Sequence, residues 1–110
     1  MEEGPICEHF QRAAELIGKR WNPQVVRALQ SDVTRFSELR ASIPPISDAL
    51  LSDRLKELEA EGIVVREVTP TTPVRITYSL TERGRDLTKV MDELGRWAER
   101  WAAVAAASPR

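Results

Sequence analysis

The chain has 110 residues and a formal net charge of −1, with 42% hydrophobic and 30% charged residues. This length suits one domain (residues 1–110) that buries roughly two-thirds of its unfolded surface, and the composition is globular rather than disordered. One cysteine excludes an intramolecular disulfide, one histidine argues against a metal site, and no apolar run approaches the ~20 residues of a membrane span. The acidic N-terminus does not resemble a signal peptide, so we expect a cytoplasmic protein without a cofactor.

Two helices are predicted in the first third of the chain. Apolar residues recur at three- and four-residue steps from Ile6 to Ile17, which predicts a first helix ending near Gly18. Asn22-Pro23 predicts the start of the second helix, with Asn as N-cap and Pro at N1. Trp21, just before this start, is expected to pack on the core, and lining a ligand pocket is the alternative.

The segment from residue 36 to residue 62 predicts two helices joined by a short turn. Apolar residues recur at helical spacing from Phe36 to Ile43, and Pro44-Pro45 forms the turn. Ser47 is the predicted N-cap of the second helix, and Gly62 its C′ residue with positive φ. Leucines form one face of this helix and short polar residues the other, as a helix that enters the DNA major groove requires. The pair therefore resembles a helix-turn-helix.

Two strands and a long helix follow. Val74 to Leu80 alternates with period two, and Ile63 to Thr69 is its predicted partner, so a hairpin comes directly after the helix-turn-helix. Thr81 is expected to cap the final helix. The predicted fold class is mainly α with a small β-hairpin wing: a winged helix-turn-helix over about residues 7–80 and a dimerisation helix over 81–107.

The final helix carries an apolar seam with a/d spacing. Its residues step by 3, 4, 3, 4 and 3: Leu87, Val90, Leu94, Trp97, Trp101 and Val104. This seam is wider than one small domain can cover with its own core. The sequence therefore predicts a homodimer through these residues, with help from Phe10 of the first helix.

Several motifs together carry a specific family resemblance. They are Cys7, ELIGKRW at 15–21, RFSELR at 35–40, LLSDRLKELEAEGIV at 50–64 and YSLTERG at 78–84. The set resembles the HxlR family of bacterial winged-helix transcription regulators, relatives of the MarR group, over about residues 7–100. The resemblance implies a homodimer that binds operator DNA, often as a repressor, and in some members an N-terminal cysteine that senses electrophiles or oxidants.

The chain departs from the family pattern at two places. It has Gly18-Lys19-Arg20-Trp21 where the family usually has Gly-Gly-Lys-Trp, and Pro73-Val74-Arg75 where the family often has Pro-Pro-Arg. The first departure adds a charge. The second keeps the arginine but can bend the wing tip differently.

Candidate base contacts follow from the helix-turn-helix geometry, in which the N-terminal residues of the second helix meet base edges. These residues are Ser47, Asp48, Ala49, Ser52 and Asp53. Serine and aspartate can hydrogen-bond to base edges, and an alanine methyl can touch a thymine methyl. Ser47 is mainly explained as an N-cap. The two aspartates are explained as readily by the positive end of the helix dipole, and near DNA they repel phosphates.

Phosphate contacts are expected from Arg35, Lys56 and Arg75, with Ser37 as a further DNA-binding candidate. The alternative for each is a solvated surface side chain. The number of charges in this segment gives no support to DNA binding, because residues 34–75 hold six basic and seven acidic side chains. Arg54 lies near the apolar face, and its guanidinium is expected to pair with a carboxylate of another helix.

Cys7 is a candidate redox or electrophile sensor. It lies at the start of the first helix, where the helix dipole favours the reactive thiolate, although Glu8 works against this. The alternative is an inert thiol packed between helices.

Three functions remain open. The favoured one is a dimeric, sequence-specific DNA-binding regulator, and the family resemblance implies a repressor. The second is a winged-helix module that binds proteins. The third, compatible with the first, is a sensor whose Trp21 and Trp97 line a pocket for a small inducer. An enzyme is not expected, because the sequence has no Gly-rich phosphate loop and no metal-spaced or Cys–His set.

Overall fold

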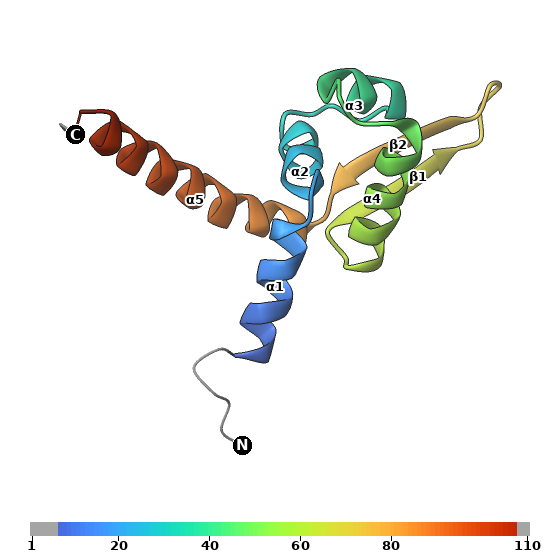
Figure 1. Ribbon diagram of the computed structural model, residues 1–110. Helices are drawn as coiled ribbons and strands as arrows, with labels where there is room; N and C mark the ends of the chain where they lie inside the picture. The colour runs from blue at the N-terminus through green and yellow to red at the C-terminus, as the bar shows by residue number, and fades with distance from the viewer. Residues whose placement is uncertain (1–6, 108–110) are drawn as a thin grey trace.

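The computed structural model describes residues 7–107, within which the chain forms five helices and one two-stranded sheet (Figure 1). The elements are α1 (Glu8–Gly18), α2 (Asn22–Gln30), α3 (Phe36–Ser42), α4 (Asp48–Ala60), β1 (Val64–Thr69), β2 (Arg75–Leu80) and α5 (Glu82–Ala107). The mainly helical class with a hairpin wing is therefore confirmed. Ile6, predicted in the first helix, lies outside the described residues.

The core lies between α2, α3, α4 and the base of the hairpin. Its buried apolar residues are Val25, Val26, Leu29, Leu39, Ile43, Ile46, Leu51, Leu55, Leu58, Ile63, Val64, Leu80 and Met91. Fully burying one such side chain contributes about 1.5–3 kcal/mol to stability. The leucine face of α4 is thus fixed inward, and its opposite face is left to solvent.

The two ends of α4 form as their residues predict. The Ser47 hydroxyl accepts a hydrogen bond from the Leu50 amide at 3.1 Å, and this satisfies one free N–H of the first turn. At the other end Gly62 has a φ of 75°, a conformation that costs glycine little. These two residues set where the helix begins and ends.

The start of α2 differs from the prediction. Trp21, with φ 78°, stands at the N-cap, and Asn22 is the first helical residue. Asn22 is buried, and its side-chain amide donates to the Leu16 carbonyl at 2.9 Å. The predicted Asn22 cap is therefore wrong, because its side chain joins the end of α1 to α2 instead.

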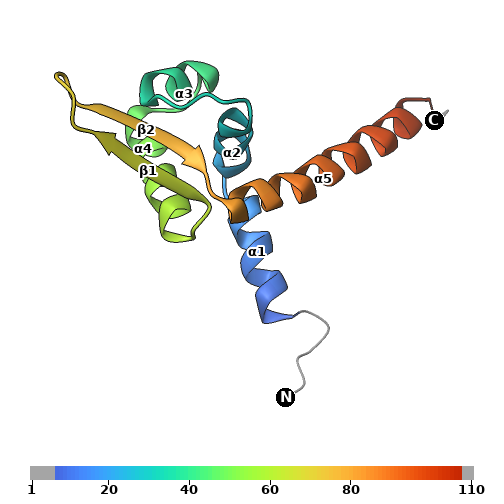
Figure 2. The same ribbon diagram turned by 180° about the vertical axis from the view of Figure 1, so that it is seen from behind.

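The hairpin is antiparallel and runs in register from the pair Val64–Leu80 to the pair Thr69–Arg75. The loop before α3 is attached to it by one backbone hydrogen bond, from the Tyr78 amide to the Thr34 carbonyl at 2.9 Å. This bond places the start of α3 beside β2. The hairpin and α5 project in opposite directions from the core, and α1 leaves in a third direction (Figures 1 and 2).

The first turns of α5 are anchored in the core. The Thr81 hydroxyl accepts from the Gly84 amide at 3.0 Å, as a cap should. Gly84, Thr88 and Met91 are buried, and Leu87 is half-buried against the chain's own core. The remainder of the helix extends away from the core. No helix within residues 7–107 is long and apolar enough to cross a membrane.

Candidate nucleic-acid interface

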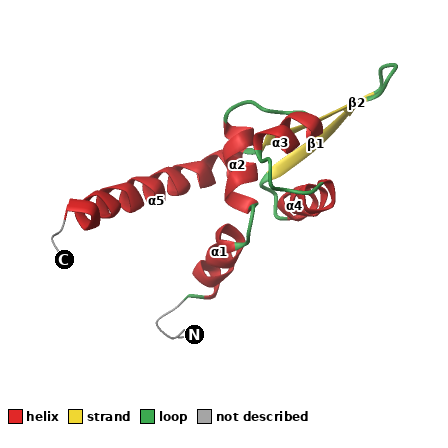
Figure 3. Ribbon diagram, turned by 45° about the horizontal axis from the view of Figure 1, so that its top comes forward, coloured by secondary structure: helices red, strands yellow, loops and turns green. Residues whose placement is uncertain are grey.

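The outer face of α4 carries the predicted base-contacting residues. Ser47, Asp48, Ala49 and Asp53 are exposed, and Ser52 is partly exposed. Because the leucines of α4 face the core, these residues lie on the solvent side of the helix. Figure 3 shows α3, α4 and the hairpin on one side of the molecule, with α5 extending away on the other.

Much of the acidic charge at α4 is paired within the chain. Arg40 Nε lies 2.9 Å from Asp48 Oδ1, although its N–H is not directed well enough for a hydrogen bond. Lys19 Nζ lies 2.6 Å from Glu57 Oε2, and Arg12 Nη2 lies 3.4 Å from Glu61 Oε2. The number of acidic side chains is therefore a poor guide to the electrostatic potential that DNA would meet at the outer face of α4.

Several cations of this region are unpaired. Within the described residues, Arg35, Lys56, Arg66 and Arg75 take part in no ion pair. All four are exposed. Arg66 was not among the predicted contacts, although an arginine in the first wing strand could have been included on the same grounds as Arg75.

The structure brings Arg35 and the wing tip together. Arg35, Thr71, Thr72 and Arg75 line a shallow hollow of about 210 Å³. The Arg35 amide donates to Glu38 Oε1 at 3.4 Å and helps to start α3, while Ser37 is exposed in its first turn. Arg35 and Arg75, 40 positions apart in sequence, thus lie at one edge beside the hairpin loop.

Arg54 has a structural position, but its partners differ from the prediction. Its side chain is only 13% exposed, and Nε donates to the Arg20 carbonyl at 2.9 Å. Its Nη1 lies 3.6 Å from Glu57 Oε1 on the same helix, one turn further on. The predicted pairing with a carboxylate of another helix is wrong, because a residue at i+3 and a nearby backbone carbonyl occupy the guanidinium.

A second surface is apolar. Five residues of the predicted seam are between 50% and 57% exposed: Val90, Leu94, Trp97, Trp101 and Val104. Phe10 on α1 is 65% exposed, and α1 has no buried residue. Leu87 differs from these, because it packs on the chain's own core. Large apolar side chains at this spacing are costly to leave in water.

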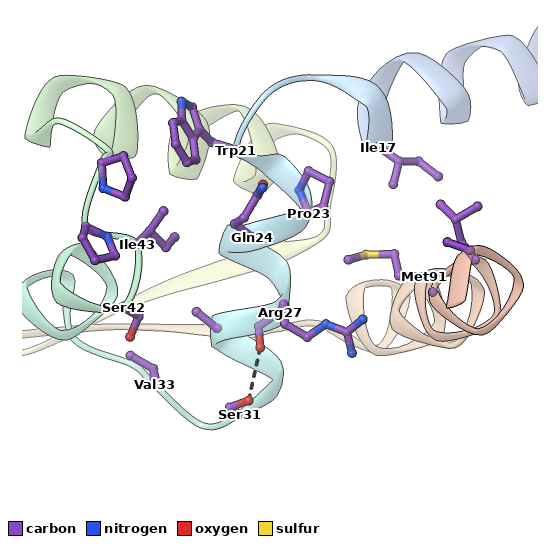
Figure 4. A pocket seen from close by; sticks show the side chains of 16 residues that line it. Ile17, Trp21, Pro23, Gln24, Arg27, Ser31, Val33, Ser42, Ile43 and Met91 are labelled. Carbon is purple, nitrogen blue, oxygen red and sulfur yellow. Dashed lines mark hydrogen bonds between the residues drawn. The ribbon is translucent and has the colours of Figure 1, made fainter. Parts of the chain in front are cut away.

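An apolar groove of about 720 Å³ runs between α2, α5 and the turn between α3 and α4 (Figure 4). Trp21, Ile43 and Met91 line it, and so does Arg27, whose Nη1 is 2.7 Å from Asp92 Oδ1. Trp97 does not line this groove and faces a separate hollow along α5. The prediction that Trp21 and Trp97 share one pocket is therefore wrong.

Cys7 stands at the N-terminal end of α1 and is half-buried. Its carbonyl accepts from the Gln11 amide at 2.9 Å, which starts the helix. The thiol is thus held at a helix N-terminus, as predicted.

The order of the helices, the hairpin and the solvent-facing second helix of the pair defines a winged helix-turn-helix transcription regulator. Residues 16–106 match the family of HxlR-like helix-turn-helix proteins. The chain belongs to this family, so the resemblance inferred from its motifs is confirmed.

Individual relatives agree with this assignment. The chain is 45% identical over 101 residues to the HTH-type transcriptional regulator YvaP of Bacillus subtilis, which covers 92% of this chain and 94% of YvaP. It is similar to the reduced form of the transcriptional regulator YodB from B. subtilis, with 44% identity and a TM-score of 0.80 over 86% of this chain and 93% of that one. YodB has also been solved after diamide treatment and with quinone bound.

A third structure, the redox regulator HypR in its reduced form, is 33% identical with a TM-score of 0.80, over 92% of this chain and all of that one. The proteins that this chain resembles are transcription regulators and not enzymes. The chain is accordingly a DNA-binding transcription regulator of the helix-turn-helix type.

Proposed function

We propose that the protein is a cytoplasmic homodimer that binds operator DNA sequence-specifically and represses transcription. The observation that carries this proposal is the outer face of α4, where the short side chains of Ala49 and Ser52 face solvent and Lys56 takes part in no ion pair among the described residues. Ala49, Ser52 and Asp53 meet base edges, while Ser47 mainly caps the helix and Asp48 mainly faces Arg40.

Phosphate contacts hold α4 in the groove. Lys56 reaches the backbone from α4 itself, and Arg35 and Arg75 do so from the edge beside the wing, together with Ser37. Such contacts fix the register on the duplex, whereas base contacts specify the sequence.

Dimerisation supplies the second recognition helix. The exposed seam of α5 and Phe10 of α1 are the surfaces that a second copy covers. A two-fold dimer presents two α4 helices to successive major grooves, so half-sites about 34 Å apart are expected.

The test is selection of binding sites from a random pool of double-stranded DNA, followed by mobility-shift titrations at several salt concentrations. A regulator selects a two-fold symmetric site and loses affinity steeply as salt rises, because phosphate contacts release counterions. The rival function is a winged-helix module that binds another protein through α5, which the net charge of −1 and the exposed seam favour. Failure to select any sequence would support that rival.

Cys7 is the proposed sensor of oxidants and electrophiles. With a quinone, the thiolate sulfur bonds to a ring carbon, and the ring takes up a proton to become a substituted hydroquinone. With diamide, two thiols lose two electrons and two protons to the N=N bond and join as a disulfide. Because the chain has one cysteine, the second sulfur comes from the other copy or from a small thiol. The diamide-treated and quinone-bound forms of YodB support this proposal.

A small apolar inducer has a candidate site in the groove beside Trp21. A molecule there would touch α5 and the turn of the helix-turn-helix at once, through Met91 and Pro44. Binding could therefore change the angle between the dimer helix and α4.

A further inference from the structure

The recognition helix is joined to the linker between α1 and α2 by a small charged cluster. Glu57 uses both carboxylate oxygens, with Lys19 Nζ 2.6 Å from Oε2 and Arg54 Nη1 3.6 Å from Oε1. Arg54 then donates from Nε to the Arg20 carbonyl at 2.9 Å. Two residues of α4 thus contact two consecutive residues of the linker.

The linker is itself held in place. Trp21 takes a φ of 78° and is half-buried, and the Arg20 guanidinium lies 4.8 Å from the centre of its ring. Asn22 is bonded to the Leu16 carbonyl at 2.9 Å. A side chain of α4 that contacts this linker is therefore attached to a fixed point of the domain.

Apolar packing sets which face of α4 points inward, and directional polar contacts can then restrict its remaining small rotations. The contacts of Leu51, Leu55 and Leu58 hold the helix on the core, but the hydrophobic effect is non-directional. Charge-assisted hydrogen bonds are short and directional. The Glu57 cluster, on the flank of α4, adds such contacts and restricts small rotations of the helix about its own axis.

We propose that Glu57 is a positioning residue for DNA recognition, held by Lys19 and Arg54 so that Ser52 and Lys56 point toward the groove. This rests on the proposed reading face of α4. Glu57 contacts no DNA in this proposal and acts through the orientation of its neighbours.

Simple electrostatics predicts the opposite effect for the same carboxylate. An acidic side chain on a helix close to DNA repels phosphates, so its removal should strengthen binding. A positioning role means that removal weakens specific binding, although the protein becomes more positive. The direction of the change therefore separates the two explanations.

The experiment compares Glu57→Ala with Glu59→Ala in the full chain, on the DNA that the unaltered protein selects. Glu59 is the matched control, because it lies on the same helix, is exposed and forms no ion pair within the described residues. We expect Glu57→Ala to weaken specific binding about two- to five-fold, as for an exposed ion pair. Glu59→Ala should bind equally well or more tightly.

Two further readouts exclude a general loss of structure. The salt slope of Glu57→Ala should match the unaltered protein, because no phosphate contact is removed. The affinity of Glu57→Ala for unrelated DNA should not fall. The ratio of its affinity for the selected site to its affinity for unrelated DNA should therefore decrease. The double variant with Lys19→Met and Glu57→Ala should lose no more affinity for specific DNA than Glu57→Ala alone. The reason is that both changes break the same contact between Lys19 and Glu57.

Some outcomes overturn this inference alone. The positioning role of Glu57 is contradicted if Glu57→Ala binds the selected site as tightly as Glu59→Ala or more tightly. It is also contradicted if the losses of affinity in the double variant are fully additive. If the unaltered protein selects no DNA, or Lys56→Ala has no effect, the proposed reading face of α4 fails first.

Discussion

The effect of each charged side chain of α4 on DNA depends on what that side chain already contacts. Asp48 and Glu57 face arginine or lysine within the chain, whereas Asp53 forms no ion pair among the described residues. Lys56 is exposed on the same helix and takes part in no ion pair within residues 7–107. Residues of like charge on one helix are therefore expected to respond differently to substitution.

Lys56→Ala and Arg75→Ala should each weaken binding to all DNA sequences. Each removes one phosphate contact, so each should lower the slope of log affinity against log salt by about one unit. Ser52→Ala removes a proposed base contact instead of a phosphate contact. It should alter the sequence preference and leave the salt slope unchanged. Mobility shifts over a salt series measure both effects. Unchanged affinity in the lysine and arginine variants would mean that they are only surface charges.

Gly84→Ala should destabilise the fold. A Cβ at this position would lie 2.3 Å from the Ile63 carbonyl oxygen, so β1 or α5 must shift. Overpacking of this kind costs about 1–3 kcal/mol, which lowers the midpoint of thermal unfolding by roughly 4 °C or more.

Gly95→Ala is the control, because nothing lies within 4 Å of its added Cβ. In a helix interior alanine is more stable than glycine by about 0.5–1 kcal/mol, so this midpoint should rise. Equal midpoints for the two variants would contradict the close approach of α5 to residue 63.

At the scale of elements, α5 has two parts with different roles. Its first turns are buried through Gly84, Thr88 and Met91, and its later turns expose the apolar seam. Because only the first turns of α5 pack on the core, the proposed dimer can dissociate while α5 keeps its position in the folded monomer. Association and folding should therefore respond to different substitutions.

Leu94→Glu combined with Trp101→Glu should convert a dimer to a monomer in sedimentation velocity. The two changes put charge into the seam, where a buried carboxylate without a partner is very costly. The helix signal in circular dichroism should remain, because residues 84–91 are untouched. Glu99→Lys, about 160° around α5 from Trp97, is the control and should stay dimeric. An unaltered protein that is monomeric at micromolar concentration would contradict the proposed dimer.

At the scale of the whole molecule, α1 connects the cysteine to the recognition helix. Cys7 stands at one end of α1, Arg12 contacts Glu61 at 3.4 Å, and Lys19 contacts Glu57 at 2.6 Å. Leu16 and Ile17 of α1 pack against the core, and the two ion pairs add polar contacts at the C-terminal end of α4. A change at Cys7 that displaces α1 would act on α4 directly.

Treatment of the DNA-bound protein with diamide or a quinone should release the DNA. Cys7→Ser removes the thiol at nearly the same size and should stay bound under the same treatment. Mass spectrometry of the treated protein should find the quinone adduct or the disulfide in the unaltered chain only. Release that is identical in both proteins would assign Cys7 to packing.

Local patterns were enough to predict most of the elements. Ser47 and Gly62 mark the ends of α4 because a cap and a positive φ depend on neighbours within one turn. The leucine spacing placed one face of α4 inward. Alternation predicted the second strand, and both predicted strands agree with β1 and β2 to within one residue. The motifs also led to the family, because they combine several such local features.

The sequence by itself therefore determined the order of elements, the inward and outward faces of α4, and the family. Only the tertiary structure decided the partners of Arg54, the pair between Lys19 and Glu57, and the approach of Arg35 to the wing tip. These contacts join residues 34 to 40 positions apart, and they depend on how whole helices are placed. Helical and strand periodicity fixes which way a side chain points from its own element, but it carries no information about the distance to another element.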